Sequence, residues 1–151
     1  MEVLILDTTD DINILNPIGK EWAATAHGVE YGLPITIEIA RATMSRMQMQ
    51  KDGDVLVLMD GNAVRGFMGL SYQLNHVGPG LIANECLFYV AQSARSGGIK
   101  LIRAAQKLAT GKGCNFFFLN ASRIAGDGDR SGALYSRMGF RHFDSSYMAV
   151  L

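Results

Sequence analysis

The chain has 151 residues, of which 48% are hydrophobic and 19% charged, with 14 basic and 14 acidic side chains. A chain of this length is expected to form one domain, residues 1–151, and to bury about two thirds of its surface on folding. The balanced charge and high hydrophobic content argue against a disordered chain and give no indication of a nucleic-acid partner.

The first 27 residues predict a strand and a broken helix. Residues 2–7 (EVLILD) form a short apolar run that is typical of a strand. Asn16 and Pro17 fit an N-cap and the first helical position, which indicates a broken helix over 10–27. This segment lacks the features of a signal peptide, and no apolar run approaches the ~20 residues of a membrane-spanning helix. A soluble, cytoplasmic protein is therefore expected, without a membrane partner.

The next segment, which Pro34 opens, allows two readings. Its apolar side chains share one helical face at Ile35, Ile39, Thr43 and Met47. The isoleucines at 35, 37 and 39 also alternate as in a strand. A helix is the favoured prediction.

Three antiparallel strands are predicted in the middle of the chain. They cover 55–59, 63–73 and 81–91, because DGN at 60–62 and GPG at 78–80 are turn signals between apolar runs. The three runs are therefore expected to form a meander.

The last third predicts a crossover unit. A buried apolar stripe indicates a helix over 98–111, ended by Gly111 or Gly113. Residues 115–120 (NFFFLN) are apolar on both faces, as in a central strand that follows a crossover helix. A helix near 131–138 and a terminal strand over 140–151 complete an α/β chain with a mixed sheet.

The two cysteines, Cys86 and Cys114, lie in strand-like apolar surroundings without CxxC or Cys/His spacing. They are expected to be buried, reduced thiols rather than ligands of a metal or parts of a disulfide framework. The three histidines are scattered along the chain, and no metal site is expected.

The segment with the clearest chemical potential is the loop between the third strand of the meander and the helix over 98–111. Gly97 and Gly98 allow close approach of a ligand to the backbone at a helix N-terminus, where N–H groups and the helix dipole favour phosphate. Arg95 adds a charged donor beside them. An ordinary glycine-containing loop is the alternative. A dinucleotide site of the Rossmann type is disfavoured because G-x-G-x-x-G is absent.

Two motifs resemble those of the GNAT acyltransferases. Residues 95–100 (RSGGIK) after Val90 are similar to the pyrophosphate loop of that family, R/Q-x-x-G-x-G/A. Residues 133–140 (ALYSRMGF) resemble its ALYxxxGF segment, in the same order and at a similar separation. The likeness extends over 55–151, whereas the N-terminal third matches in element order only. Glu85 with Tyr89 and Val90 also resembles small bacteriophage-encoded members.

The resemblance implies a GNAT fold with a mostly antiparallel sheet of six to seven strands, a βαβ cofactor unit and about four helices. It implies acetyl-CoA as co-substrate, with the acyl thioester lying where the strand ending at Val90 parts from the strand over 116–120. The residues expected to bind the cofactor are Tyr89, Val90, Arg95, Ser96, Gly97, Gly98, Ile99, Lys100, Asn120 and Tyr135. Lys100 departs from the Gly or Ala of the motif, so its stem must turn away from the cofactor; the alternatives are that its ammonium reaches a phosphate or that the loop binds differently. For Asn120 the alternative to binding pantetheine is a capping role.

Two residues are implied as catalytic. Tyr135 matches the family tyrosine that protonates the departing thiolate, and its alternative role is that of a core aromatic. Glu85 is expected to remove a proton from the attacking ammonium if burial raises its pKa, and its alternative is a solvent-facing strand residue. Strand alternation places Glu85 and Tyr89 on one face, opposite Val90, unless a bulge intervenes.

The sequence therefore predicts transfer of an acetyl group from acetyl-CoA to a primary amine, by direct attack in a ternary complex. The acceptor is a small molecule or a protein, and the residues do not choose between them. The alternative is a GNAT-shaped module that binds CoA or another protein without turnover. A homodimer is possible, since many relatives pair through their C-terminal strands.

Overall fold

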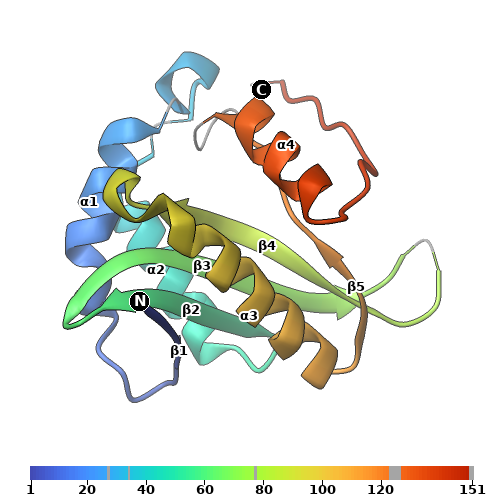
Figure 1. The fold of residues 1–151 in the computed structure, drawn as a ribbon, viewed down its shortest axis with the longest axis horizontal. Coiled ribbons are helices and arrows are strands. Elements are labelled where there is room, and N and C mark those ends of the chain that lie inside the picture. The colour runs from blue at the N-terminus through green and yellow to red at the C-terminus, as the bar shows by residue number, and fades with distance from the viewer. Residues whose placement is uncertain (27, 34, 77, 123–126, 150–151) are drawn as a thin grey trace.

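A mixed five-stranded sheet with helices on both faces organises the described part of the chain, residues 1–26, 28–33, 35–76, 78–122 and 127–149 of a computed structural model (Figure 1). The strands are β1 (Glu2–Leu6), β2 (Gly53–Asp60), β3 (Ala63–Leu74), β4 (Leu81–Val90) and β5 (Cys114–Phe118). The α-helices are α1 (Asn16–Thr25), α2 (Ile37–Met49), α3 (Gly98–Gly111) and α4 (Gly128–Arg137). Short 3-10 helices are η1 (Ile12–Leu15), η2 (Gly28–Tyr31) and η3 (Gln92–Gly97).

The sheet is a meander followed by one crossover. β1 to β4 pair as antiparallel neighbours, and β5 pairs parallel to β4 after α3 has crossed the sheet. Gly61 follows β2 in the turn to β3 and has a φ of 57°. Glycine adopts this left-handed conformation without steric cost, and a tight hairpin requires it. The three predicted strands of the meander and the predicted helix over 98–111 are thus confirmed.

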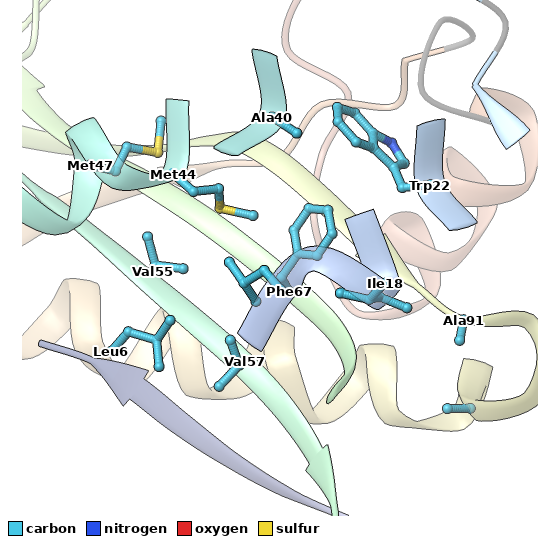
Figure 2. Close-up of a cluster of buried hydrophobic side chains, with 12 residues drawn as sticks. Leu6, Ile18, Trp22, Ala40, Met44, Met47, Val55, Val57, Phe67 and Ala91 are labelled. Carbon is cyan, nitrogen blue, oxygen red and sulfur yellow. The ribbon is translucent and has the colours of Figure 1, made fainter. Parts of the chain in front are cut away.

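Two buried clusters fix which helices cover which face. Val55, Val57 and Phe67 face α1 and α2, together with Trp22, Met44 and other side chains (Figure 2). Leu56, Leu58, Met68 and Leu70 face α3 and α4, together with Leu101, Ile102, Ala105 and Tyr135. Alternate residues of β2 therefore contribute to opposite cores, as the period of two in a strand requires. Burial on both faces explains the nearly continuous apolar run of this strand.

The N-terminal helices differ in detail from the sequence prediction. Leu15 takes the N-cap position of α1 and Asn16 is its first residue, so the predicted Asn16 cap is wrong, although Pro17 lies in the first turn. In α2 the hydroxyl of Thr36 accepts a hydrogen bond from the N–H of Ile39 and caps the helix. Of the predicted face, Met47 is buried, but Ile39 is 53% exposed, because the buried side of the helix is turned toward Ala40 and Met44.

The predicted terminal strand is wrong for residues 140–149, and residues 150–151 lie outside the described part. Phe140 packs against Phe117, and Phe143 stacks on Phe118 with ring centroids 5.2 Å apart. Both rings thus contact adjacent aromatic side chains of β5, but the backbone of 140–149 does not pair with any strand of the described sheet. Side-chain bonds of His142 and Asp144 to Ser145 compete further with strand pairing. The described sheet accordingly has five strands rather than six or seven, and β5 lies at its edge rather than in its centre.

The two cysteines are free, but they are not both buried as expected. Cys86 is exposed and Cys114 is half-buried. Within the described residues, no group of three or more potential metal-ligating side chains is present. Of the described helices, none is both long enough and apolar enough to cross a membrane.

Candidate active site

The candidate site begins where β4 and β5 part. Their parallel pairing ends at Asn84 and Phe118, while β4 continues for six more residues to Val90. The N–H of Ala91 donates to the Arg65 carbonyl at 2.8 Å on the β3 side. Because successive N–H groups of a strand point to alternate sides, the N–H of Val90 points away from β3 and into the parting. The predicted parting of these two strands is therefore present.

A β-bulge on β4 decides which side chains enter the site. Leu87 is opposite Gly69 and Glu85 is opposite Leu70, so Cys86 is an extra residue without a partner on β3. The extra residue reverses the alternation. Glu85 therefore shares the α3 and α4 face, whereas Tyr89 packs beside Phe67 on the α1 and α2 face. Glu85 and Tyr89 lie on opposite faces, and the expectation for an unbulged strand does not hold.

Glu85 is the charged side chain that the fold buries most deeply among those described, with 4% of it exposed. Desolvation raises the pKa of Glu85 to about 7, and hydrogen bonds from Asn120 oppose this rise. The Asn120 N–H donates to Glu85 Oε2 at 3.0 Å. The solvent-facing alternative for Glu85 is therefore wrong, and the side chain has the acidity expected of a general base near neutral pH.

Tyr135 reaches the same place from the opposite layer. The Asp127 carboxylate accepts a hydrogen bond of 3.0 Å from the N–H of Arg130 and caps α4, which carries Tyr135 toward the sheet. Its hydroxyl lies 3.5 Å from the carbonyl oxygen of Asn120, and 6% of its side chain is exposed. Burial, and then the charge of Glu85, raise the pKa of Tyr135 above its ordinary value. The two predicted catalytic residues are thus brought together around Asn120.

The loop predicted to bind phosphate is a 3-10 helix that leads directly into α3. The N–H of Gly98 donates to the Arg95 carbonyl inside this turn. A β-carbon on Gly97 would lie 2.3 Å from Leu58 Cδ2, so any other residue there displaces the fully buried Leu58 side chain. A β-carbon on Gly98 would meet the side chains of Phe88 and Val90 at 3.6 Å. The contact with Leu58 accounts for Gly97 without a phosphate, whereas packing inside the protein does not require glycine at 98.

Other predicted cofactor residues have protein partners. Lys100 Nζ donates to the Met1 carbonyl at 3.0 Å, so this side chain turns toward β1. The Tyr89 hydroxyl donates to Glu21 Oε1 on α1 at 2.9 Å. The side-chain amide of Asn120 donates to the Glu85 carbonyl. Arg95 and Ser96 are exposed, and Ile99 is half-buried.

A groove between α3 and α4 adds residues that the motifs did not indicate. It has a volume of about 570 Å³ and is lined by Ile99, Arg103, Gln106, Leu134, Arg137 and Met138. The residues from α3 recur at i, i+4 and i+7, and those from α4 at i, i+3 and i+4, so each set forms one helical face. Two arginines, Arg103 and Arg137, thus line the groove together with apolar residues, one of which, Ile99, belongs to the predicted loop. In the sequence, the signal that could have indicated the α3 side of this groove is the pair of polar residues that follow the loop at helical spacing, Arg103 and Gln106.

Comparison with known proteins supports the fold. No family model and no curated protein matches the sequence. A ribosomal-protein-alanine N-acetyltransferase from Brucella melitensis biovar Abortus 2308 is similar over 100% of both chains, with 18% identity and a TM-score of 0.73. An aminoglycoside acetyltransferase from an uncultured soil metagenomic sample is similar over 99% of this chain and 97% of that one, with 16% identity and a TM-score of 0.73.

A GNAT family acetyltransferase from Staphylococcus aureus subsp. aureus USA300_TCH1516 is similar over 100% of both chains, with 14% identity and a TM-score of 0.66. Sequence identities this low establish a shared fold and leave the activity to be argued from the site. The chain has the GNAT fold.

Proposed function

We propose that the protein is an N-acyltransferase that transfers an acetyl group from acetyl-CoA to a primary amine, by direct attack in a ternary complex. The observation that carries this proposal is the unpaired stretch of β4, whose Val90 N–H points into the parting from β5. Glu85 and Tyr135 meet at that same parting. A hydrogen-bond donor, a base and an acid around one opening are the groups that acyl transfer requires.

The residues present fit coenzyme A. Its phosphates match the two guanidinium groups of the α3 and α4 groove, Arg103 and Arg137, because arginine binds phosphate through paired donors. Its amide-rich arm matches the free edge of β4, which offers backbone donors and acceptors in strand geometry. Arg95, at the exposed start of the loop, adds a further positive charge. Lys100 turns away toward Met1 and leaves the groove side of α3 open.

Acetyl-CoA would supply the acyl group on a thioester. The Val90 N–H would donate to the carbonyl oxygen of that group and stabilise negative charge as it develops there. Glu85 would accept a proton from the amine, whose nitrogen forms a bond to the carbonyl carbon. Tyr135 would donate a proton to the sulfur as the carbon–sulfur bond breaks. Glu85 then passes its proton to Tyr135, directly or through solvent, so that both residues return to their starting states.

The cysteines favour direct attack over an acyl-enzyme. A cysteine nucleophile needs a thiolate, and partial desolvation by neighbouring atoms raises the pKa of the thiol in both Cys86 and Cys114. The Cys86 thiol contacts the Ser71 hydroxyl at 3.3 Å and the Asn84 carbonyl at 3.6 Å, and neither group is a base strong enough to activate it. Transfer without a covalent relay is the simpler route.

The test combines binding and turnover. Acetyl-CoA is expected to raise the melting temperature, since a ligand that binds the native state stabilises it. Free thiol is expected to appear when amines are added, and a panel should include small amines and peptides with a free N-terminus or lysine. Stabilisation without thiol release across the panel would favour the non-catalytic module. Absence of both effects would contradict any role based on coenzyme A.

A further inference from the structure

Asn120 contacts both members of the proposed acid–base pair. Its main-chain N–H donates to Glu85 Oε2 at 3.0 Å, and its side-chain amide donates to the Glu85 carbonyl. Its own carbonyl oxygen lies 3.5 Å from the Tyr135 hydroxyl. One residue, two positions beyond the end of β5, therefore links β4 to α4 across the opening.

We propose that Asn120 is a positioning residue, which orients Glu85 and Tyr135 and holds β4 and β5 at the separation that the acyl group requires. This inference rests on the proposed acyl transfer and assigns Asn120 a role different from direct binding of the cofactor. Asn120 acts through Glu85 and Tyr135 rather than on the reacting atoms.

The geometry of the strands supports this role. Regular pairing between β4 and β5 stops at Asn84 and Phe118, so a continued ladder would occupy the outward backbone groups of β4. Among the described contacts, the Asn120 side chain instead binds the backbone of β4 at the Glu85 carbonyl. The two strands are thereby fixed at one point, and the outward N–H of Val90 is left to a ligand. Because one side-chain bond replaces continued backbone pairing between β4 and β5, the parting of the two strands stays rigid and remains accessible to a ligand.

Asn115 provides an internal comparison at the other end of the strand. Its side-chain oxygen accepts a hydrogen bond from the Leu81 N–H at 3.3 Å, where β4 and β5 begin to pair. Two asparagines thus bind the backbone of β4 from either end of β5, but Asn120 alone of these two contacts Glu85 and Tyr135. Loss of Asn115 removes a similar structural bond without disturbing the acid–base pair.

The groups facing Glu85 make the effect of Asn120 measurable. The described groups that influence it are the Tyr135 hydroxyl from α4, the Cys86 thiol next along β4 and the amides of Asn120. The Asn120 amides lower the pKa of Glu85 against the effect of burial. Removal of the Asn120 side chain leaves the main-chain bond to Oε2 in place and takes away the smaller of the two Asn120 effects together with the bond that holds this backbone against β4, so the pKa of Glu85 rises further and less of the base is ionised at neutral pH.

The experiment compares Asn120→Ala with Asn115→Ala. The ionisation of Glu85 is followed by carbon-13 NMR of its carboxyl group in the ligand-free protein, and the signal is assigned with Glu85→Gln. The midpoint of the Glu85 titration is expected to move to higher pH in Asn120→Ala and to stay at the wild-type value in Asn115→Ala. In turnover assays, kcat at pH 7 is expected to fall about tenfold in Asn120→Ala, while KM for acetyl-CoA stays nearly constant. The rise of kcat on the acid side of its pH profile is expected to move to higher pH, as the NMR titration does.

Asn120→Asp is the second variant, because it keeps the shape of the side chain and removes its donor. It is expected to displace the Glu85 midpoint upward as well, through the added carboxyl group. Wild-type titration curves in both Asn120 variants would overturn the positioning role. A wild-type protein that turns over no amine would instead contradict the proposed function, while the NMR titration would still decide the role of Asn120.

Discussion

The main-chain nitrogen of Asn120 lies 3.0 Å from Glu85 Oε2, and this hydrogen bond holds a carboxyl group that is almost completely removed from water. Burial of a carboxyl without a positive partner disfavours its ionised form. The fold therefore carries a destabilising group at the position where a base is needed, which is the usual relation between stability and an active site.

The first prediction concerns the pH dependence of stability. The pKa of Glu85 is raised from 4.5 to about 7, so this residue contributes stability that is complete below pH 4.5 and is lost as pH rises through 7. Glu85→Gln removes this dependence. Urea unfolding is expected to show wild type losing about 3 kcal/mol relative to Glu85→Gln between pH 4 and pH 8. Parallel stability curves for the two proteins would show that Glu85 ionises normally.

The second prediction concerns Tyr135. Tyr135→Phe removes a hydroxyl whose bond to Asn120 is long, at 3.5 Å, so stability should change little. The kcat is expected to fall at least about tenfold because the departing sulfur loses its acid. The dissociation constant for acetyl-CoA should stay within a factor of about two. Tyr147→Phe is the matched control, since that side chain is 96% exposed, and it should retain wild-type turnover. An unchanged kcat in Tyr135→Phe would remove this tyrosine from the mechanism.

The third prediction separates the two glycines of the loop. Gly97→Ala places a methyl group 2.3 Å from the fully buried Leu58 and is expected to cost about 1–3 kcal/mol of the free energy of unfolding. Gly98→Ala meets its neighbours at 3.6 Å, an ordinary contact, and should leave stability unchanged or raise it by up to about 1 kcal/mol. Denaturant unfolding of the two variants checks this. Equal stabilities would mean that the contact of Gly97 with the sheet is unimportant.

The fourth prediction concerns the groove between α3 and α4. Arg103→Ala and Arg137→Ala should each weaken the binding of CoA about tenfold or more, as loss of a charge-assisted hydrogen bond requires. Lys107→Ala is the control on the same helix, because Lys107 does not line the groove but carries the same charge. Calorimetric titration with CoA measures all three. Equal affinities in the arginine variants and the lysine variant would place the phosphates elsewhere.

The local signals of the sequence were sufficient for most of the fold. Turn residues, alternation and one amphipathic stripe predicted β2, β3, β4 and α3 almost to the residue. The terminal strand failed because residues 140–149 contact β5 through the rings of Phe140 and Phe143 without backbone pairing, and whether a segment pairs depends on tertiary context rather than on local strand propensity.

The candidate site was predicted only in part, because part of its geometry also depends on tertiary packing. Glu85 and Tyr135 follow from motifs, and the structure places them together. The bulge at Cys86, which puts Glu85 and Tyr89 on opposite faces, has no signature in the local sequence. Arg103 and Arg137 lie on different helices, so their shared groove depends on how α3 and α4 pack.

The most direct test of acyl transfer at the parting of β4 and β5 is a crystal structure with an acetyl-CoA analogue in which a methylene group replaces the thioester sulfur. We predict that the pantetheine arm lies along the free edge of β4, with the acetyl oxygen within hydrogen-bonding distance of the Val90 N–H. An analogue bound elsewhere, with the parting closed or filled by side chains, would contradict the assignment.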